Sequence, residues 1–94
     1  SQKLSPEALL NHAQSLRQAG RLQEATLAFE KLKGLYPKFP PILNDLAILY
    51  LQQGKFNEGR QLLEKSLQLD PKQPMALISA YYQCNLILWM LNLI

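Results

Sequence analysis

Apolar residues recur along the chain at intervals of three and four, the spacing that forms one face of an α-helix. Such stripes run through Leu9, Ala13 and Leu16, through Leu22, Ala25, Phe29 and Leu32, through Leu43, Leu46, Ala47 and Tyr50, and through Phe56, Gly59 and Leu63. The strict alternation that is typical of a strand occurs nowhere. We therefore predict an all-α protein with helices at about residues 6–19, 22–35, 41–53, 56–69 and 74–93.

Proline and glycine divide these helices into pairs. Ser5 followed by Pro6 is a favourable start for the first helix, because serine caps a helix and proline fits its first turn. Gly20 and Gly54 each separate two helices, where the backbone can turn without a Cβ clash. Prolines interrupt the chain between pairs, at positions 37, 40, 41, 71 and 74. Because the connections are short, we expect consecutive helices to pack antiparallel.

The two pairs are copies of one unit. An offset of 34 residues relates Gly20 to Gly54. The same offset pairs Ala13 with Ala47, Leu16 with Tyr50, Glu24 with Glu58, Glu30 with Glu64, Lys31 with Lys65, and Pro37 with Pro71. A fixed period of this length indicates a helical repeat protein, in which each unit stacks on its neighbour.

The repeated positions resemble the tetratricopeptide repeat, a helix–turn–helix unit of 34 residues. The second unit supplies Leu43, Leu46, Ala47, Tyr50, Gly59, Leu63 and Pro71, and the first supplies Leu9, His12, Ala13, Leu16, Ala25, Phe29 and Pro37. The resemblance implies a right-handed solenoid of about five helices. Within a single domain over residues 1–94, we expect repeats at 6–39 and 40–73 and an atypical C-terminal helix at 74–94.

The resemblance also implies a function. Members of the family bind proteins or peptides in a concave groove made mainly by the first helix of each unit. The corresponding positions are Leu10, Asn11, Gln14 and Arg17, then Asn44, Asp45, Ile48 and Leu51, then Ile78, Ser79, Tyr82 and Asn85. Some members grip a C-terminal carboxylate with a cluster of cations, but Arg17 is the only cation in this set. We therefore expect a protein-interaction module that does not use a carboxylate clamp.

The C-terminal segment differs from the repeats. No charged residue follows Lys72, and Leu88 stands where the repeats place Gly20 and Gly54. We therefore expect the last helix to run on through Trp89 towards Ile94. Three explanations of its apolar surface remain open: a third repeat with bare core residues, a homodimer interface, or a membrane segment. Dispersed polar residues such as Ser79 and Gln83 disfavour the membrane, and we predict self-association through Ile87, Trp89, Met90, Leu91 and Ile94.

The composition of the chain limits the classes of partner that we expect. Ten basic and seven acidic residues give a net charge of +3, but the basic residues are scattered singly along the chain. A nucleic-acid-binding surface clusters them, so we expect no nucleic acid partner. One cysteine excludes an internal disulfide and fits a reducing, cytoplasmic location. No apolar stretch follows Ser1, so no signal peptide is expected, and the chain resembles a fragment of a larger protein.

Catalytic chemistry is not expected. His12 and Cys84 are single examples of their types and are interpreted as packing residues, and together they cannot form a zinc site. The four glycines are isolated, so there is no phosphate-binding loop, and Glu24 and Glu58 fit the start of second helices. We expect no enzyme activity, metal or cofactor. Two alternatives stay open: a segment of a larger transferase, and a self-assembly module that acts through the last helix.

Overall fold

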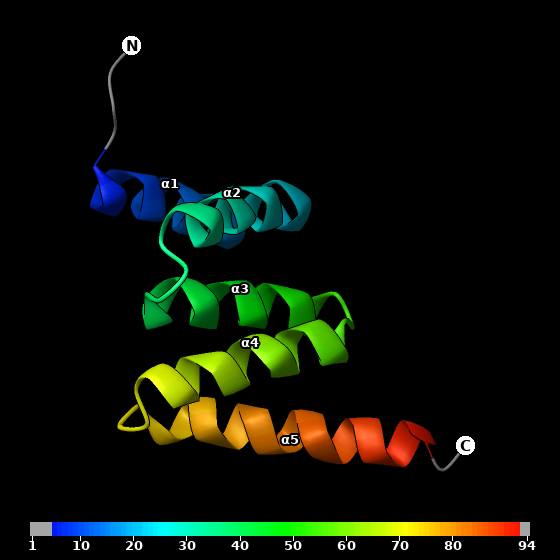
Figure 1. Ribbon diagram of the computed structural model, residues 1–94. Helices are drawn as coiled ribbons and strands as arrows, with labels where there is room; N and C mark the ends of the chain where they lie inside the picture. The colour runs from blue at the N-terminus through cyan, green and yellow to red at the C-terminus, as the bar shows by residue number, and fades with distance from the viewer. Residues whose placement is uncertain (1–4, 93–94) are drawn as a thin grey trace.

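The computed structural model describes residues 5–92 and consists of five helices without strands in that range. They are α1 (Pro6–Gln18), α2 (Leu22–Leu35), α3 (Pro40–Gln52), α4 (Phe56–Leu69) and α5 (Met75–Asn92). The predicted helices are confirmed, with ends that differ by at most one residue within the described range, whereas the predicted end of the last helix at residue 93 lies outside it. The helices follow one another along an elongated stack of 51 × 28 × 20 Å, with α1 and α5 at opposite ends (Figure 1).

The helix ends follow from local chemistry. The Ser5 hydroxyl accepts a hydrogen bond from the Ala8 N–H (3.2 Å), and Pro6 occupies the first turn of α1. The turn glycines adopt positive φ angles, 81° at Gly20 and 78° at Gly54. After each glycine the next N–H bonds back to the preceding helix, from Arg21 to the Leu16 carbonyl (3.0 Å) and from Lys55 to the Tyr50 carbonyl (2.8 Å). Both turns therefore close in the same way, as expected of a repeat.

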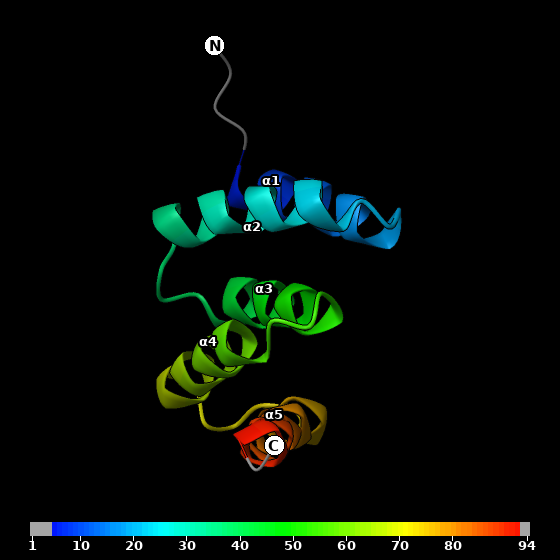
Figure 2. The same cartoon turned by 90° about the vertical axis from the view of Figure 1, so that its right-hand side faces the viewer.

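Each helix packs on its neighbours in sequence, and α1 also touches α3 across the boundary between the two units. Figure 2 shows α4 displaced to one side of α3, so that α3 lies on one side of the stack and α4 on the other. Short connections produce this antiparallel arrangement. The first helices of the units thus share one side of the molecule.

The core consists of the striped positions. Phe29, Leu43, Leu46 and Leu63 are completely buried, and they form one continuous apolar cluster with the other core residues. The small residues at the repeat's close-packing positions are buried too: Ala13, Ala25, Ala47 and Gly59. Small side chains let helix axes approach each other, which is the role that the sequence predicts for them.

Helix α5 departs from the repeat packing. Cys84 is its only buried residue, and Leu77, Ala80 and Tyr81 pack half-buried against the core. Ala76 and Gln83 are exposed, although their counterparts in α3 are buried against the preceding unit. Tyr81 stands where α3 has Ala47, and such a large side chain prevents the same close approach. As predicted, α5 continues past Leu88 without a turn.

The length and hydropathy of α5 raise the question of a membrane. Across residues 5–92, none of the helices is both long enough and apolar enough to span a bilayer.

Candidate protein-binding face

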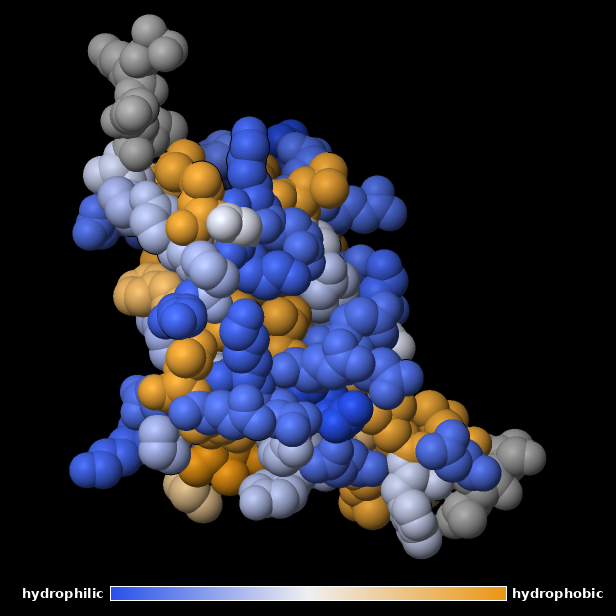
Figure 3. Space-filling model, in the orientation of Figure 1, coloured by the Kyte–Doolittle hydropathy of each residue, from blue (hydrophilic) through white to orange (hydrophobic). Residues whose placement is uncertain are grey.

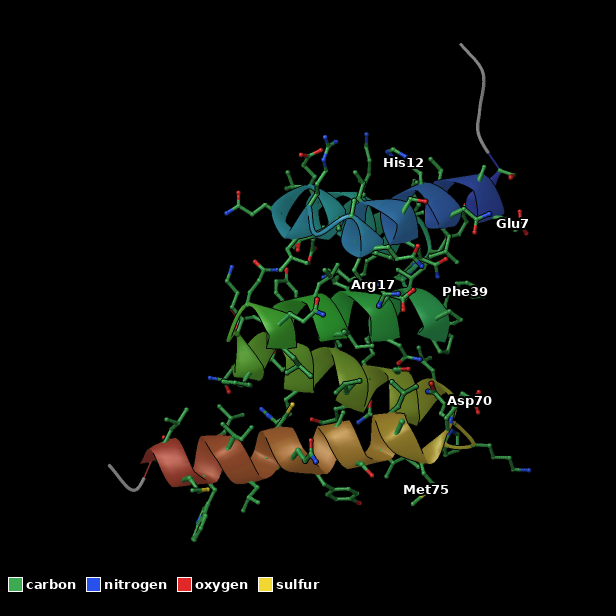
Figure 4. The ribbon with its side chains drawn as sticks, turned by 180° about the vertical axis from the view of Figure 1, so that it is seen from behind. Glu7, His12, Arg17, Phe39, Asp70 and Met75 are labelled. Atoms are coloured by element: carbon green, nitrogen blue, oxygen red, sulfur yellow. The ribbon has the colours of Figure 1, made fainter. Side chains whose placement is uncertain are left out.

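The candidate site is the side of the stack formed by α1, α3 and α5, which we call the first-helix face. Figure 4 views the molecule from this side, with Arg17 between α1 and α3 and with Glu7 and Phe39 at one edge. The sequence assigns the groove residues to these three helices. The contacts of each side chain decide which of them remain accessible to a partner.

A polar seam joins α1 to α3. Gln14 Nε2 donates a hydrogen bond to one carboxylate oxygen of Asp45 (2.9 Å), and the Arg17 guanidinium lies 3.6 Å from the other. Both members of the ion pair are largely shielded from solvent. The charge of Arg17 is therefore balanced within the chain, and the seam holds the two units in register.

Two other predicted groove residues are committed to internal contacts. Asn44 accepts a hydrogen bond from the buried Ser66 hydroxyl (2.6 Å) and donates one to Gln73 Oε1 (2.7 Å). Gln73 Nε2 also donates to Ser66 Oγ (2.8 Å), which closes a triad between α3, α4 and the α4–α5 connection. Leu51 lies directly over Gly59 in α4. Neither Asn44 nor Leu51 projects freely from the face.

The remaining predicted groove residues stay accessible. Asn11 is exposed, Leu10 and Ile48 are half-buried, and Tyr82 is 64% exposed. The ring of Tyr82 meets Tyr81 edge to face, with centroids 5.5 Å apart. This part of the face offers apolar contact area with few charges.

A pocket on this face was not predicted from the sequence. It has a volume of about 230 Å³ and is walled by Pro6, Glu7, Leu10, Tyr36, Phe39 and Ile42. Phe39 begins the second unit and is 46% exposed, although aromatic side chains usually seek burial. Its position in the repeat corresponds to Gln73 of the second unit. An aromatic residue in the connection between two units was therefore the sequence signal that could have revealed the pocket.

The titratable residues do not converge on a reactive centre. His12 is exposed on the outer side of α1, away from α3, so its predicted packing role is wrong (Figure 4). No helix among residues 5–92 covers it there. Cys84 lies at the far end of the stack, where burial raises the pKa of its thiol and nearby Arg60 partly opposes this. Among the described residues, no group of three histidine, cysteine or carboxylate side chains could hold a metal ion.

The predicted self-association residues fall on both sides of α5. Trp89, Met90 and Leu91 are exposed and Ile87 is half-buried, whereas Ile94 lies outside the described residues. Apart from Leu91, the large exposed apolar residues of α5 form an outward stripe on this helix: Met75, Tyr82, Leu86, Trp89 and Met90. Figure 3 shows apolar surface gathered where the end of α5 extends beyond the body of the molecule.

Comparisons with known proteins agree with the geometry. The family model for the tetratricopeptide repeat matches residues 16–81. Coatomer subunit epsilon-2 of Arabidopsis thaliana is 40% identical over 57 residues, which are 61% of this chain and 20% of that protein. The chain thus spans about a fifth of this relative's length. The globular C-terminal domain of P. aeruginosa LpoP superposes with a TM-score of 0.71 at 25% identity, covering 89% of this chain and 78% of that one.

Proposed function

Because the chain belongs to the tetratricopeptide repeat family, we propose that it is a protein-interaction module whose first-helix face binds a protein or peptide partner. The family's fold is generally used for such contacts. Its relative in Arabidopsis is, by name, one subunit of a larger assembly, which agrees with a binding role.

The pocket beside Phe39 is the observation that carries the proposal. It is bounded mainly by apolar side chains and opens on the face where α1 and α3 meet, next to the accessible Leu10. An interface gains most of its affinity from a few anchors that fill such pockets. We therefore expect one apolar side chain of the partner to enter this pocket.

The charges around the pocket suggest what flanks that anchor. Glu7 lines the pocket and forms no ion pair among the described residues, whereas Arg17 is already paired with Asp45. A basic residue next to the anchor would complement Glu7. A partner carboxylate would find Arg17 already paired with Asp45.

A random peptide library tests the proposal, because it samples many combinations of anchor and flanking side chains at once. Peptides displayed on phage would be selected on the immobilised chain, and the Kd of the enriched peptides would be measured by fluorescence anisotropy. We expect peptides with an aliphatic or aromatic anchor beside lysine or arginine. Leu10→Ser and Phe39→Ser should each weaken binding about tenfold or more, as expected when an anchor's pocket is lost.

Leu69→Ser is the matched control, because Leu69 is 40% exposed, close to the 46% of Phe39, and lies outside the pocket. It should leave the Kd unchanged. Enriched peptides that bind the Leu10 and Phe39 variants as tightly as the original chain would place the binding site elsewhere and refute this assignment.

Self-association through α5 is a second candidate function. The outward stripe on α5 supports it, because a large exposed apolar patch on a helix without charges commonly marks an interface. Light scattering during size exclusion, over a concentration series, tests it directly. A mass that rises with concentration is expected, and a strictly monomeric mass throughout would contradict it.

A further inference from the structure

A second apolar groove lies at the opposite end of the stack from α5. It runs between α1 and α2, has a volume of about 320 Å³, and is lined by Leu9, His12, Ala28 and Lys31 with Leu27 and Leu35 on its walls. Leu27 is 71% exposed and Leu35 is 59% exposed. We call this surface the N-terminal groove.

The repeat provides an internal comparison for this groove. In the second unit the positions of Leu9 and Ala28 are taken by Leu43 and Leu62, which are buried within the stack. The N-terminal groove is therefore the repeat's own stacking surface, which no helix among residues 5–92 covers in the first unit. Stacking contacts in a solenoid join unlike surfaces, the end of one unit to the start of the next.

The groove differs from that stacking surface in one informative way. On α1, His12 and Ser15 replace Leu46 and Leu49, both of which are completely buried in α3. A complete further repeat would have to bury these polar side chains. The apolar side chains on α2 form the rest of the groove, so a single apolar helix that lies along them fits better than another helix pair.

The outward stripe on α5 has the properties of such a helix. Its apolar residues are spaced by seven, four, three and one, which places them along one side of the helix. The chain carries no charged residue after Lys72, so α5 brings no cation towards Lys31 in the groove. A helix that lays its apolar side into a groove is a recurring mode of recognition.

We propose that α5 of one copy docks in the N-terminal groove of the next copy, so that the chains assemble head to tail. This inference rests on the self-association proposed above and specifies its second surface. The two surfaces lie at opposite ends of the stack, so one pair of copies cannot satisfy both contacts at once (Figure 1). When successive copies joined head to tail do not form a closed ring, they produce open chains. A symmetric contact through α5 alone would instead stop at a dimer.

Complementation between two blocked variants tests this arrangement. Leu27→Glu places a charge in the groove, and Met90→Glu places one on the stripe; both residues are more than half exposed, so the fold should tolerate the change. By light scattering, the unmodified chain should grow beyond a dimer with concentration and each variant should stay monomeric. An equimolar mixture of the two variants should form dimers and stop there, because one intact groove meets one intact stripe.

Several outcomes would overturn the proposal. If Leu27→Glu assembles like the unmodified chain while Met90→Glu is monomeric, self-association stands but the groove is not its second surface. If both variants are monomeric and their mixture does not form dimers, the contact is not head to tail. A monomeric unmodified chain would refute self-association as well, while peptide binding on the first-helix face would be unaffected.

Gln61→Glu is the matched control for added charge, because Gln61 occupies the position of Leu27 in the second unit and is exposed. It should assemble like the unmodified chain. Circular dichroism of each variant should give an unchanged helical spectrum, which ensures that a lost assembly reports a lost contact.

Discussion

A Cβ atom built on Gly59 in α4 would lie 2.6 Å from Cδ2 of Leu51 in α3 and 3.2 Å from the carbonyl oxygen of Ala47. The two helices therefore approach each other at Gly59 more closely than a side chain there allows. In the first unit the equivalent pair is Arg17 and Ala25. Because the Arg17 side chain extends towards Asp45 of the next unit, the first unit has room for the buried side chain of Ala25.

This contact predicts opposite effects for two glycine substitutions. Gly34 in α2 has no atom within 4 Å of a built Cβ, so Gly34→Ala should raise the free energy of unfolding by about 0.5–1 kcal/mol through helix propensity and reduced unfolded-state entropy. Gly59→Ala has the same intrinsic gain, but it forces Leu51 to move and should lower stability by about 1 kcal/mol. Urea unfolding followed by circular dichroism measures both.

Leu51→Ala supplies the control for this pair, since it removes the obstructing atoms. Gly59→Ala should be less destabilising in the Leu51→Ala background than in the original chain. A Gly59→Ala variant that is stabilised as much as Gly34→Ala would show that the close approach of α3 and α4 relaxes without cost.

The triad of Asn44, Ser66 and Gln73 leads to a second prediction, because the first unit has Leu10, Leu32 and Phe39 at these positions. Ser66→Leu alone should lower the free energy of unfolding by about 3 kcal/mol, since it overfills a buried site and removes hydrogen bonds from two partly buried amides. Replacing all three residues by their first-unit counterparts removes the three mutually bonded side chains together, and only the backbone carbonyls of Ser66 and Asp70 lose a donor, Gln73 Nε2. That triple variant should lie within about 1 kcal/mol of the original chain.

Denaturant midpoints at constant m-value would compare the two variants. Asn11→Leu is a suitable control, because Asn11 is exposed, and it should change stability by less than about 0.5 kcal/mol. If the triple variant is as unstable as Ser66→Leu, the triad contributes more to the free energy of unfolding than the hydrogen bonds by which its three side chains satisfy one another.

The sequence predicts the fold well because the fold depends on local and repeated signals. Helical spacing, Pro6, and the turn glycines Gly20 and Gly54 act within a few residues of themselves, and the structure reproduces each of them. The long α5 was also predictable, because Leu88 removes the turn that glycine allows in the other two units.

The site was less predictable because its residues depend on distant partners. Position in the repeat assigns Asn44 and Leu51 to the groove, but Asn44 is held by Ser66 and Leu51 covers Gly59, and these contacts are specific to the second unit. His12 was expected to pack, yet its burial would require a unit in front of it. A family pattern gives the location of a side chain on a helix and not the contacts that it makes.

Tyr50 gives a prediction about alkaline pH. Burial, its hydrogen bond to Glu30 and the charges of Glu30 and Glu58 raise the pKa of Tyr50 to about 12, above the ordinary value of 10.0. Its contribution to stability is therefore fully present below pH 10, where the phenol is protonated in both states. Between pH 10 and 12 the unfolded chain loses this proton first, so the free energy of unfolding should fall as the pH rises.

Tyr50→Phe separates this effect from every other effect of alkaline pH on stability. The variant should be less stable at neutral pH by about 1 kcal/mol, since it loses one hydrogen bond while Glu30 keeps its ion pair with Lys33. Its stability should fall less steeply between pH 10 and 12. Parallel curves for the two proteins, measured by urea unfolding, would contradict the assigned role of Tyr50.

Cys84 offers a measure of how firmly α5 is attached to the stack. Burial raises the pKa of its thiol, against a smaller opposing effect of Arg60, and the side chain is almost inaccessible. Reaction requires a thiolate and access to it, so a disulfide reagent must wait for α5 to separate locally from α4. At equal pH, we expect the native chain to react at least about 100-fold more slowly than the chain in denaturant, the ratio set by this local opening.

Two substitutions on α5 would show that the reaction reports the attachment of this helix. Leu77 packs against the core, so Leu77→Ala should accelerate labelling of Cys84, whereas Gln83→Ala changes an exposed residue outside the stripe and should not. If labelling is fast in the unmodified chain and insensitive to Leu77→Ala, α5 is not held on α4 in solution. The outward stripe would then belong to a detached helix, with both of its sides available to a partner.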